Sequence, residues 1–168
     1  RSLPNTLLLH ITEHQPHFYT EIDGGYILLS EKLTVLDFKT TLDDNYKKQA
    51  THLLLPEIQS YQIGDKIVLD DVNSQYCFAV LRTLHESPLS DSLNVIDLRQ
   101  KFAITFSCAH RYKVEIGTYR DVEKHLPVCV RTINTVENDP YLTGIGGIIY
   151  CLTDESASFL PTGIQEVN

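Results

Sequence analysis

The sequence contains no methionine and no tryptophan, and it is poor in basic residues. Lys and Arg together number 14 against 22 Asp and Glu, which gives a formal net charge of −8. This charge disfavours nucleic acid or an anionic membrane surface as the main partner. No apolar run approaches the roughly 18 residues of a membrane span, and the N-terminus has no signal-peptide pattern. We therefore expect no membrane insertion.

The missing methionine and the start at Arg1-Ser2 are typical of a segment excised from a longer protein. The 168 residues have the length of one ordinary domain. Apolar residues make up 42% and charged residues 21%, close to globular averages, which argues against disorder and solenoid repeats. We expect residues 1–168 to form a single folded domain.

Four cysteines are present, an even number that would permit two disulfides. Each nevertheless lies in an apolar, strand-like stretch, where a free buried cysteine behaves as a small hydrophobe; these are Cys77, Cys108, Cys129 and Cys151. No Asn-x-Ser/Thr glycosylation sequence occurs. We therefore predict free thiols and a reducing compartment, the cytoplasm or the nucleus.

Short apolar runs and alternation of apolar with polar residues dominate the chain, a pattern that is typical of strands. Ten candidate strands cover residues 7–12, 25–29, 32–38, 65–72, 76–84, 93–98, 102–108, 111–117, 128–133 and 146–152. Helices are predicted only over 42–55, capped by Asp43 or Asp44, and over 118–126, begun by Thr118 and ended before Pro127. We predict an all-β barrel or sandwich of about ten short strands with one or two short helices.

The stretch LLLHITEHQPH at residues 7–17 brings three histidines together. His10-Ile11-Thr12 resembles the His-x-Thr/Ser signature of two-histidine phosphoesterases, in which two such strands face each other and act as acid and base on a cyclic phosphate. The second copy would be His85-Glu86-Ser87, which Pro88 follows directly. The resemblance implies an alternative function in which His10 and His85 perform this chemistry.

The residues favour neither a metal site nor covalent catalysis. His10, His14 and His17 would align on a helix, but the strand pattern and Pro16 exclude a regular helix there. Cys108-x-His110 lacks zinc-finger spacing. The glycine-rich stretch TGIGGIIYC, residues 143–151, has an isoleucine where an elbow would present its nucleophile. We assign no catalytic, cofactor-binding or metal-binding residue and expect no cofactor.

A second alternative is an OB-type barrel that binds single-stranded nucleic acid. The segment YQIGDKIVL, residues 61–69, has the strand–Gly–Asp–strand form of such barrels. Single-strand binding requires aromatic and basic side chains together. The chain offers one such cluster, formed by Arg111, Tyr112, Lys113, Tyr119 and Arg120.

The segment from residue 64 to residue 133 resembles the CABIT module, the cysteine-containing all-β module of Themis-type and GAREM-type signalling adaptors. Tyr76-Cys77-Phe78 corresponds to the cysteine strand, residues 79–92 to the variable gap, and residues 93–98 to the strand that follows. Residues 119–130, YRDVEKHLPVCV, resemble the closing segment. Ile96-Asp97 stands where the family has Leu-Pro, and the glycine of its Gly-x-Phe is missing.

This resemblance implies a non-enzymatic module that contacts other proteins in signalling, in Themis-type adaptors a tyrosine phosphatase. It also implies that Cys77 is a core residue. We therefore predict an intracellular protein–protein interaction module, with its binding face unassigned.

Overall fold

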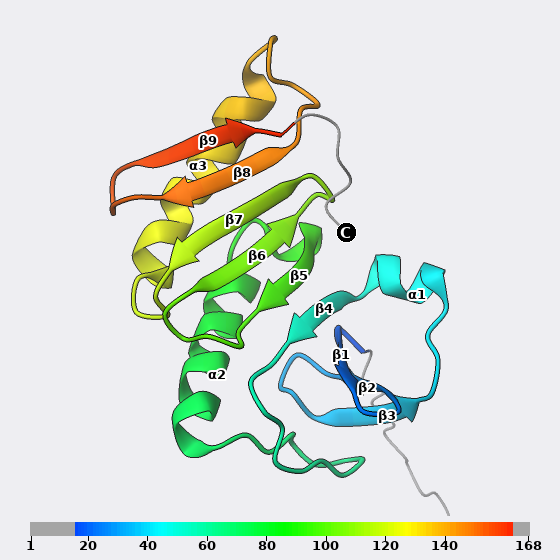
Figure 1. The fold of residues 1–168 in the computed structure, drawn as a ribbon. Helices are drawn as coiled ribbons and strands as arrows, with labels where there is room; N and C mark the ends of the chain where they lie inside the picture. Colours follow the sequence, from blue (N-terminus) through cyan, green and yellow to red (C-terminus); the bar gives the residue numbers. More distant parts are fainter. Residues whose placement is uncertain (1–15, 163–168) are drawn as a thin grey trace, which may run out of the picture.

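A single nine-stranded sheet dominates the computed structural model, which describes residues 16–162 (Figure 1). The strands in chain order are β1 (Phe18–Ile22), β2 (Gly25–Leu29), β3 (Val35–Lys39), β4 (Thr51–Leu54), β5 (Leu93–Asp97), β6 (Ile104–Cys108), β7 (Tyr112–Gly117), β8 (Gly147–Cys151) and β9 (Ala157–Pro161). Their order in the sheet is β3-β2-β1-β4-β5-β6-β7-β8-β9. The mostly-sheet prediction is confirmed, but the sheet is open between its edges β3 and β9, so the barrel alternative is wrong.

Within residues 16–162, three helices and one 3-10 turn at Ser90–Ser92 join the strands. The helices are α1 (Asp44–Gln49), α2 (Asp71–His85) and α3 (Val122–Asn138). The Asp43 carboxylate accepts a hydrogen bond from the Tyr46 N–H at 2.7 Å and so caps α1, as predicted. The helix predicted over 42–55 nevertheless ends early, because Ala50 is extended and residues 51–54 pair as β4.

Three predicted strands are wrong, and two of them lie in helices. Residues 76–84 belong to α2 and residues 128–133 belong to α3. Both segments are rich in β-branched or aromatic residues, but their buried positions recur at helical spacing, as in Cys77, Val80, Leu81 and Leu84. The segment predicted as a strand over 65–72 makes only two isolated bridges, through Lys66 and Val68, and its last two residues already belong to α2. The strand predicted over 7–12 lies outside the described residues.

The chain from β4 to β9 consists of two successive strand–helix–strand–strand units. The first is β4-α2-β5-β6 and the second is β7-α3-β8-β9. In each unit the helix joins a parallel strand pair, β4 with β5 or β7 with β8, and the other strand pair is antiparallel. Parallel neighbours require a crossover, which each helix provides.

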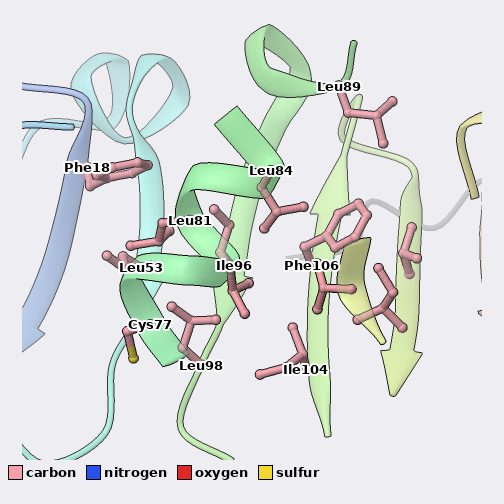
Figure 2. Packing of buried hydrophobic residues seen from close by; sticks show 14 of the residues in the cluster. Phe18, Leu53, Cys77, Leu81, Leu84, Leu89, Ile96, Leu98, Ile104 and Phe106 are labelled. Carbon is pink, nitrogen blue, oxygen red and sulfur yellow. The ribbon is translucent and has the colours of Figure 1, made fainter. Parts of the chain in front are cut away.

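Both long helices cover the same face of the sheet, where they enclose the main core. Figure 2 shows Cys77, Leu81 and Leu84 of α2 packed near side chains of the central strands. Those partners include Leu53 of β4, Ile96 of β5, and Phe106 of β6, none more than 2% exposed. Burying an aliphatic or aromatic side chain contributes about 1.5–3 kcal/mol, so this layer stabilises the contact between α2 and the sheet.

The turn between β6 and β7 is strained. Ala109 and His110 both have a positive φ, 52° and 55°, a region that costs a residue with a Cβ about 1–2 kcal/mol. The Arg111 N–H donates to the Cys108 carbonyl, so Ala109 and His110 are the two central residues of a β-turn of type I′ geometry, whose twist matches that of the strands. Asn94 supports the turn, since its Oδ1 accepts a hydrogen bond from the His110 N–H at 2.7 Å.

Ala109→Gly should therefore raise the free energy of unfolding by about 0.5–1 kcal/mol, because glycine adopts a positive φ without the Cβ clash. Ala79→Gly is the control, since Ala79 is exposed in the interior of α2, and there glycine should lower stability by about 1 kcal/mol. Urea denaturation measures both changes. A destabilised Ala109→Gly variant would contradict the left-handed geometry of this turn.

Two cysteines form a disulfide, contrary to the prediction of four free thiols. Cys129 of α3 is bonded to Cys151 at the end of β8, 22 residues further along the chain. The packing of α3 against β8 brings the two cysteines together, and the sequence around either cysteine does not predict this contact. Cys77 and Cys108 are free and buried. Burial raises the pKa of each of these two thiols to about 12.

Thiol titration tests this arrangement directly. In the native protein Cys77 and Cys108 should not react at neutral pH, because they are buried and protonated. After unfolding without reductant, two thiols should react, and four should react after reduction. Cys151→Ser should also lower the free energy of unfolding by about 3 kcal/mol through the lost loop closure. Four reactive thiols in the unfolded, unreduced protein would contradict the disulfide.

Candidate functional site

The face of β5–β9 opposite α2 and α3 carries no helix within residues 16–162, and we call it the open face. In Figure 1, α3 lies behind β8 and β9, so the open face of these strands is turned toward the viewer. The strand register aligns its side chains in two rows across the sheet. The first row is Val95, Ser107, Lys113, Ile148 and Leu160, and the second is Asp97, Thr105, Glu115, Tyr150 and Ser158.

The open face is polar at its centre and apolar at one end. Ile148, Tyr150 and Leu160 form the apolar end on β8 and β9, and Leu160 is 51% exposed. Hydroxyl and charged side chains lie on β5, β6 and β7. Protein contact surfaces commonly combine aromatic and aliphatic side chains with hydrogen-bonding groups in this way.

Two ion pairs lie on the polar part of the open face. Arg99 donates to both carboxylate oxygens of Asp97, at 3.0 and 2.6 Å, and Lys113 Nζ lies 3.1 Å from Glu115 Oε1. Burial acts to raise the pKa of Asp97, but its hydrogen bonds with Arg99 outweigh this effect and hold that pKa below its usual value. Asp97 therefore stays ionised at neutral pH and presents a fixed negative charge.

Ser107 lies at the centre of the open face and has an unsatisfied hydroxyl. Its side chain is on β6 between Val95 and Lys113, the residue is only 7% exposed, and its Oγ has no hydrogen-bond partner among the described residues. An unpaired buried polar atom costs about 1–3 kcal/mol. Because this oxygen is itself buried, a polar group that binds over β6 would reach it only after neighbouring side chains move.

His52 of β4 extends the first row beyond Val95 and stacks on Tyr19 of β1. The two ring centroids are 4.6 Å apart and the planes differ by 4°. Its Nε2 is buried and has no partner in the described part of the chain. Burial is the main cause that lowers the pKa of His52, so the neutral imidazole is favoured.

The opening histidine stretch and His85 do meet, through His17. His17 Nε2 lies 3.3 Å and His85 Nε2 3.8 Å from the same Glu31 oxygen. All three line a cavity of about 210 Å³, together with Thr51 and Asp91. No three metal-ligating side chains within residues 16–162 are placed to hold an ion.

The geometry of a two-histidine phosphoesterase is not formed at His85. That mechanism requires His-x-Thr/Ser on two facing strands, whereas His85 is the last residue of helix α2. His10, the proposed partner, and His14 lie outside the described residues.

The other two histidines of the described chain are separate from this cluster. His110 contacts Asn94, whereas His125 is buried, with Nδ1 2.7 Å from the Ile116 carbonyl and Nε2 3.3 Å from Asp154. His125 thus joins α3 to β7 and to the β8–β9 turn.

The basic and aromatic cluster proposed for nucleic acid is divided between two sides of the sheet. Tyr112 is fully buried on the helix side and donates to Glu137 at 2.5 Å, while Arg111 also donates to Glu137. Burial, then this hydrogen bond, raises the pKa of Tyr112 to about 12. Lys113 instead lies on the open face, so the side chains form no single stacking platform.

Compared with known proteins, the chain matches no family model and no curated protein sequence. None of the described helices has the length and apolar character needed to cross a membrane.

The open face was not predicted, although part of its signal is present in the sequence. Alternation along residues 104–108 and 112–117 separates Thr105, Ser107, Lys113 and Glu115 from their apolar neighbours. This pattern indicates which side chains share a face within each strand. The pattern does not give the order of the strands in the sheet, and it is this order that aligns the rows.

The titration of His52 tests the burial of its ring beside the open face. Because burial lowers the folded-state pKa of His52, its imidazole should titrate below the ordinary value of about 6.5 in NMR spectra. The contribution of His52 to the free energy of unfolding should be unaffected by pH above about 6.5. It should fall as the pH drops from this value toward the folded-state pKa. His52→Phe keeps an aromatic ring beside Tyr19 and should reduce this slope by up to about 1.4 kcal/mol per pH unit. A midpoint at or above 6.5 would contradict the burial of this ring.

Proposed function

We propose that this chain is a non-enzymatic protein–protein interaction module that binds its partner through the open face. The observation that carries the proposal is the placement of α2 and α3 on one side of the sheet, which leaves β5–β9 without a helix on the other side in the described chain. A sheet with one solvated face is common. In this protein, the combination of exposed apolar and charged side chains on the open face favours a binding role.

The apolar end of the open face supplies contact area. Leu160 is 51% exposed on the edge strand β9, and Leu152, just beyond β8, is 63% exposed. Beside them, Ile148 and Tyr150 are only partly exposed. A partner with apolar side chains would bury these groups, at about 25 cal/mol for each Å² of apolar surface removed from water.

The polar centre supplies specificity. The Asp97–Arg99 and Lys113–Glu115 pairs place both signs of charge on this part of the face, beside the buried Ser107. A partner that offers charges opposite to those of these pairs would fit this surface.

The edge of β9 is less suited to binding than the face. In an antiparallel sheet, alternate backbone groups of an edge strand point outward and can pair with an added strand. Pro161 has no N–H to donate, and it ends a strand of only five residues. We therefore place the partner over the sheet rather than beside it.

A role in a signalling adaptor, in the cytoplasm or nucleus, extends this proposal through the resemblance to the CABIT module. Cys77 is buried in the core, as that resemblance implies, although it lies on α2 rather than on a strand. The Cys129–Cys151 disulfide argues against a reducing compartment. The thiol count described above, made on protein from its native source, tests the compartment.

Affinity capture with paired variants tests the open face. Leu160→Glu introduces a charge at the apolar end and should reduce retention of the partner at least about tenfold, which corresponds to 1.4 kcal/mol. Val72→Glu is the matched control, because Val72 is 61% exposed on α2 and the charge change is the same. The partner from nuclease-treated extract should be retained by wild type and Val72→Glu alike.

Two outcomes would contradict the proposal. Equal capture of the same partner by both variants would place the interface elsewhere on the molecule. Retained proteins that disappear after nuclease treatment would indicate binding through nucleic acid instead, with the steep salt dependence of phosphate contacts.

A further inference from the structure

A groove of about 540 Å³ lies between α2 and the turn that joins β2 to β3. It is separate from the open face, which is formed by β5–β9. Gln75, Ala79 and Arg82 line it from one side of α2, and Glu31 and Lys32 line it from the turn. This volume is within the range of about 300–1,000 Å³ that small-molecule sites occupy.

Positive charge converges on this groove in a chain whose net charge is −8. Lys32, Lys66 and Arg82 line it, and none of the three forms an ion pair with an acid among residues 16–162. Glu31 is the one acidic residue among the described lining residues, and two histidines contact its carboxylate. The groove therefore has an excess of positive charge that a bound anion would neutralise.

The floor of the groove is apolar and aromatic. Phe18 of β1 and Leu81 of α2 are 7% and 4% exposed, and the partly buried Phe78 ring lies beside them. Lys66 Nζ lies 5.2 Å from the centroid of the Phe78 ring, so a cation is held at the edge of this floor. Cations around an apolar floor are complementary to a molecule with an anionic head and an apolar body.

Local hydrogen bonds fix the turn that carries Glu31 and Lys32. Ser30 Oγ accepts from the N–H groups of Lys32 and Thr34 at 3.3 and 3.1 Å. Leu33 has a positive φ of 58° and a fully buried side chain, so its burial in the core offsets the backbone strain. Because the turn is anchored in this way, the Lys32 backbone has a defined position at the groove.

We propose that this groove binds a small organic anion, a phosphate, sulfonate or carboxylate joined to an aromatic or aliphatic body. Lys32, Lys66 and Arg82 contact the anionic group, and Phe18, Phe78 and Leu81 contact the body. The proposal does not depend on the interaction function of the open face, because the two surfaces share no residue.

Anilinonaphthalenesulfonate is a suitable probe, because it combines a sulfonate with aromatic rings and its fluorescence rises in apolar surroundings. At about 50 mM salt, where charge contacts are weakly screened, the folded wild-type chain should bind one molecule of it. The double variant Lys66→Gln/Arg82→Gln should raise the dissociation constant at least about tenfold. Higher salt should weaken wild-type binding more than binding to this variant.

The matched control is Lys48→Gln/Arg131→Gln, which removes one lysine and one arginine at exposed helical positions outside the groove. It changes the net charge equally and should alter the dissociation constant less than about twofold. A second test is Ala79→Glu, which adds a negative charge at an exposed groove position and should also weaken binding at least about tenfold. Thermal unfolding of each variant shows whether the fold is preserved.

Displacement of the probe by octyl phosphate or octanoate would support the proposal and show which anionic group is preferred. The proposal is overturned if the probe does not bind, or if the two double variants weaken binding equally. It is also overturned if inorganic phosphate displaces the probe as well as octyl phosphate does. Stronger displacement by an acidic Glu/Leu peptide would overturn it in favour of a peptide groove.

Discussion

The handedness of two crossover connections determines the arrangement of this molecule. A strand–helix–strand crossover between parallel neighbours is right-handed in nearly all proteins. Strands β4 and β7 run in the same direction, and each is followed in the sheet by its parallel partner on the same side. Right-handed crossovers then place α2 and α3 on one face. The core forms beneath these helices, and the opposite face of β5–β9 has no crossover to cover it.

The sequence predicted those elements whose side chains alternate clearly. Strands β6 and β7 were identified because Phe106 and Val114 are flanked by polar or small residues, and β2, β3, β5 and β8 were identified from similar patterns. The segments within α2 and α3 were assigned wrongly because valine and isoleucine favour strands locally, while packing against the sheet decides in favour of helix. The short strands β1 and β9 were not predicted, and β4 was included in the helix predicted over 42–55.

The candidate sites depend on contacts between distant parts of the chain, so local patterns could not identify them. The open face aligns Ser107 with Val95 and Lys113 through strand register. Glu31, which meets both His17 and His85, lies in a turn whose role no local motif indicates. From the sequence, His85 was paired with His10, which lies outside the described residues, and not with His17. The carboxylate that joins His17 to His85 was not identified.

The two strand–helix–strand–strand units also have a consequence for synthesis on the ribosome. The first unit is translated before the second, and β7 follows β6 after only a short turn, so the edge of β6 is paired quickly. The edge of β7 must wait until all of α3 and then β8 have emerged. During that interval β7 is an exposed edge of the partly formed sheet, a position prone to pair with another nascent chain. The completed sheet ends instead at β9, where Pro161 limits such pairing.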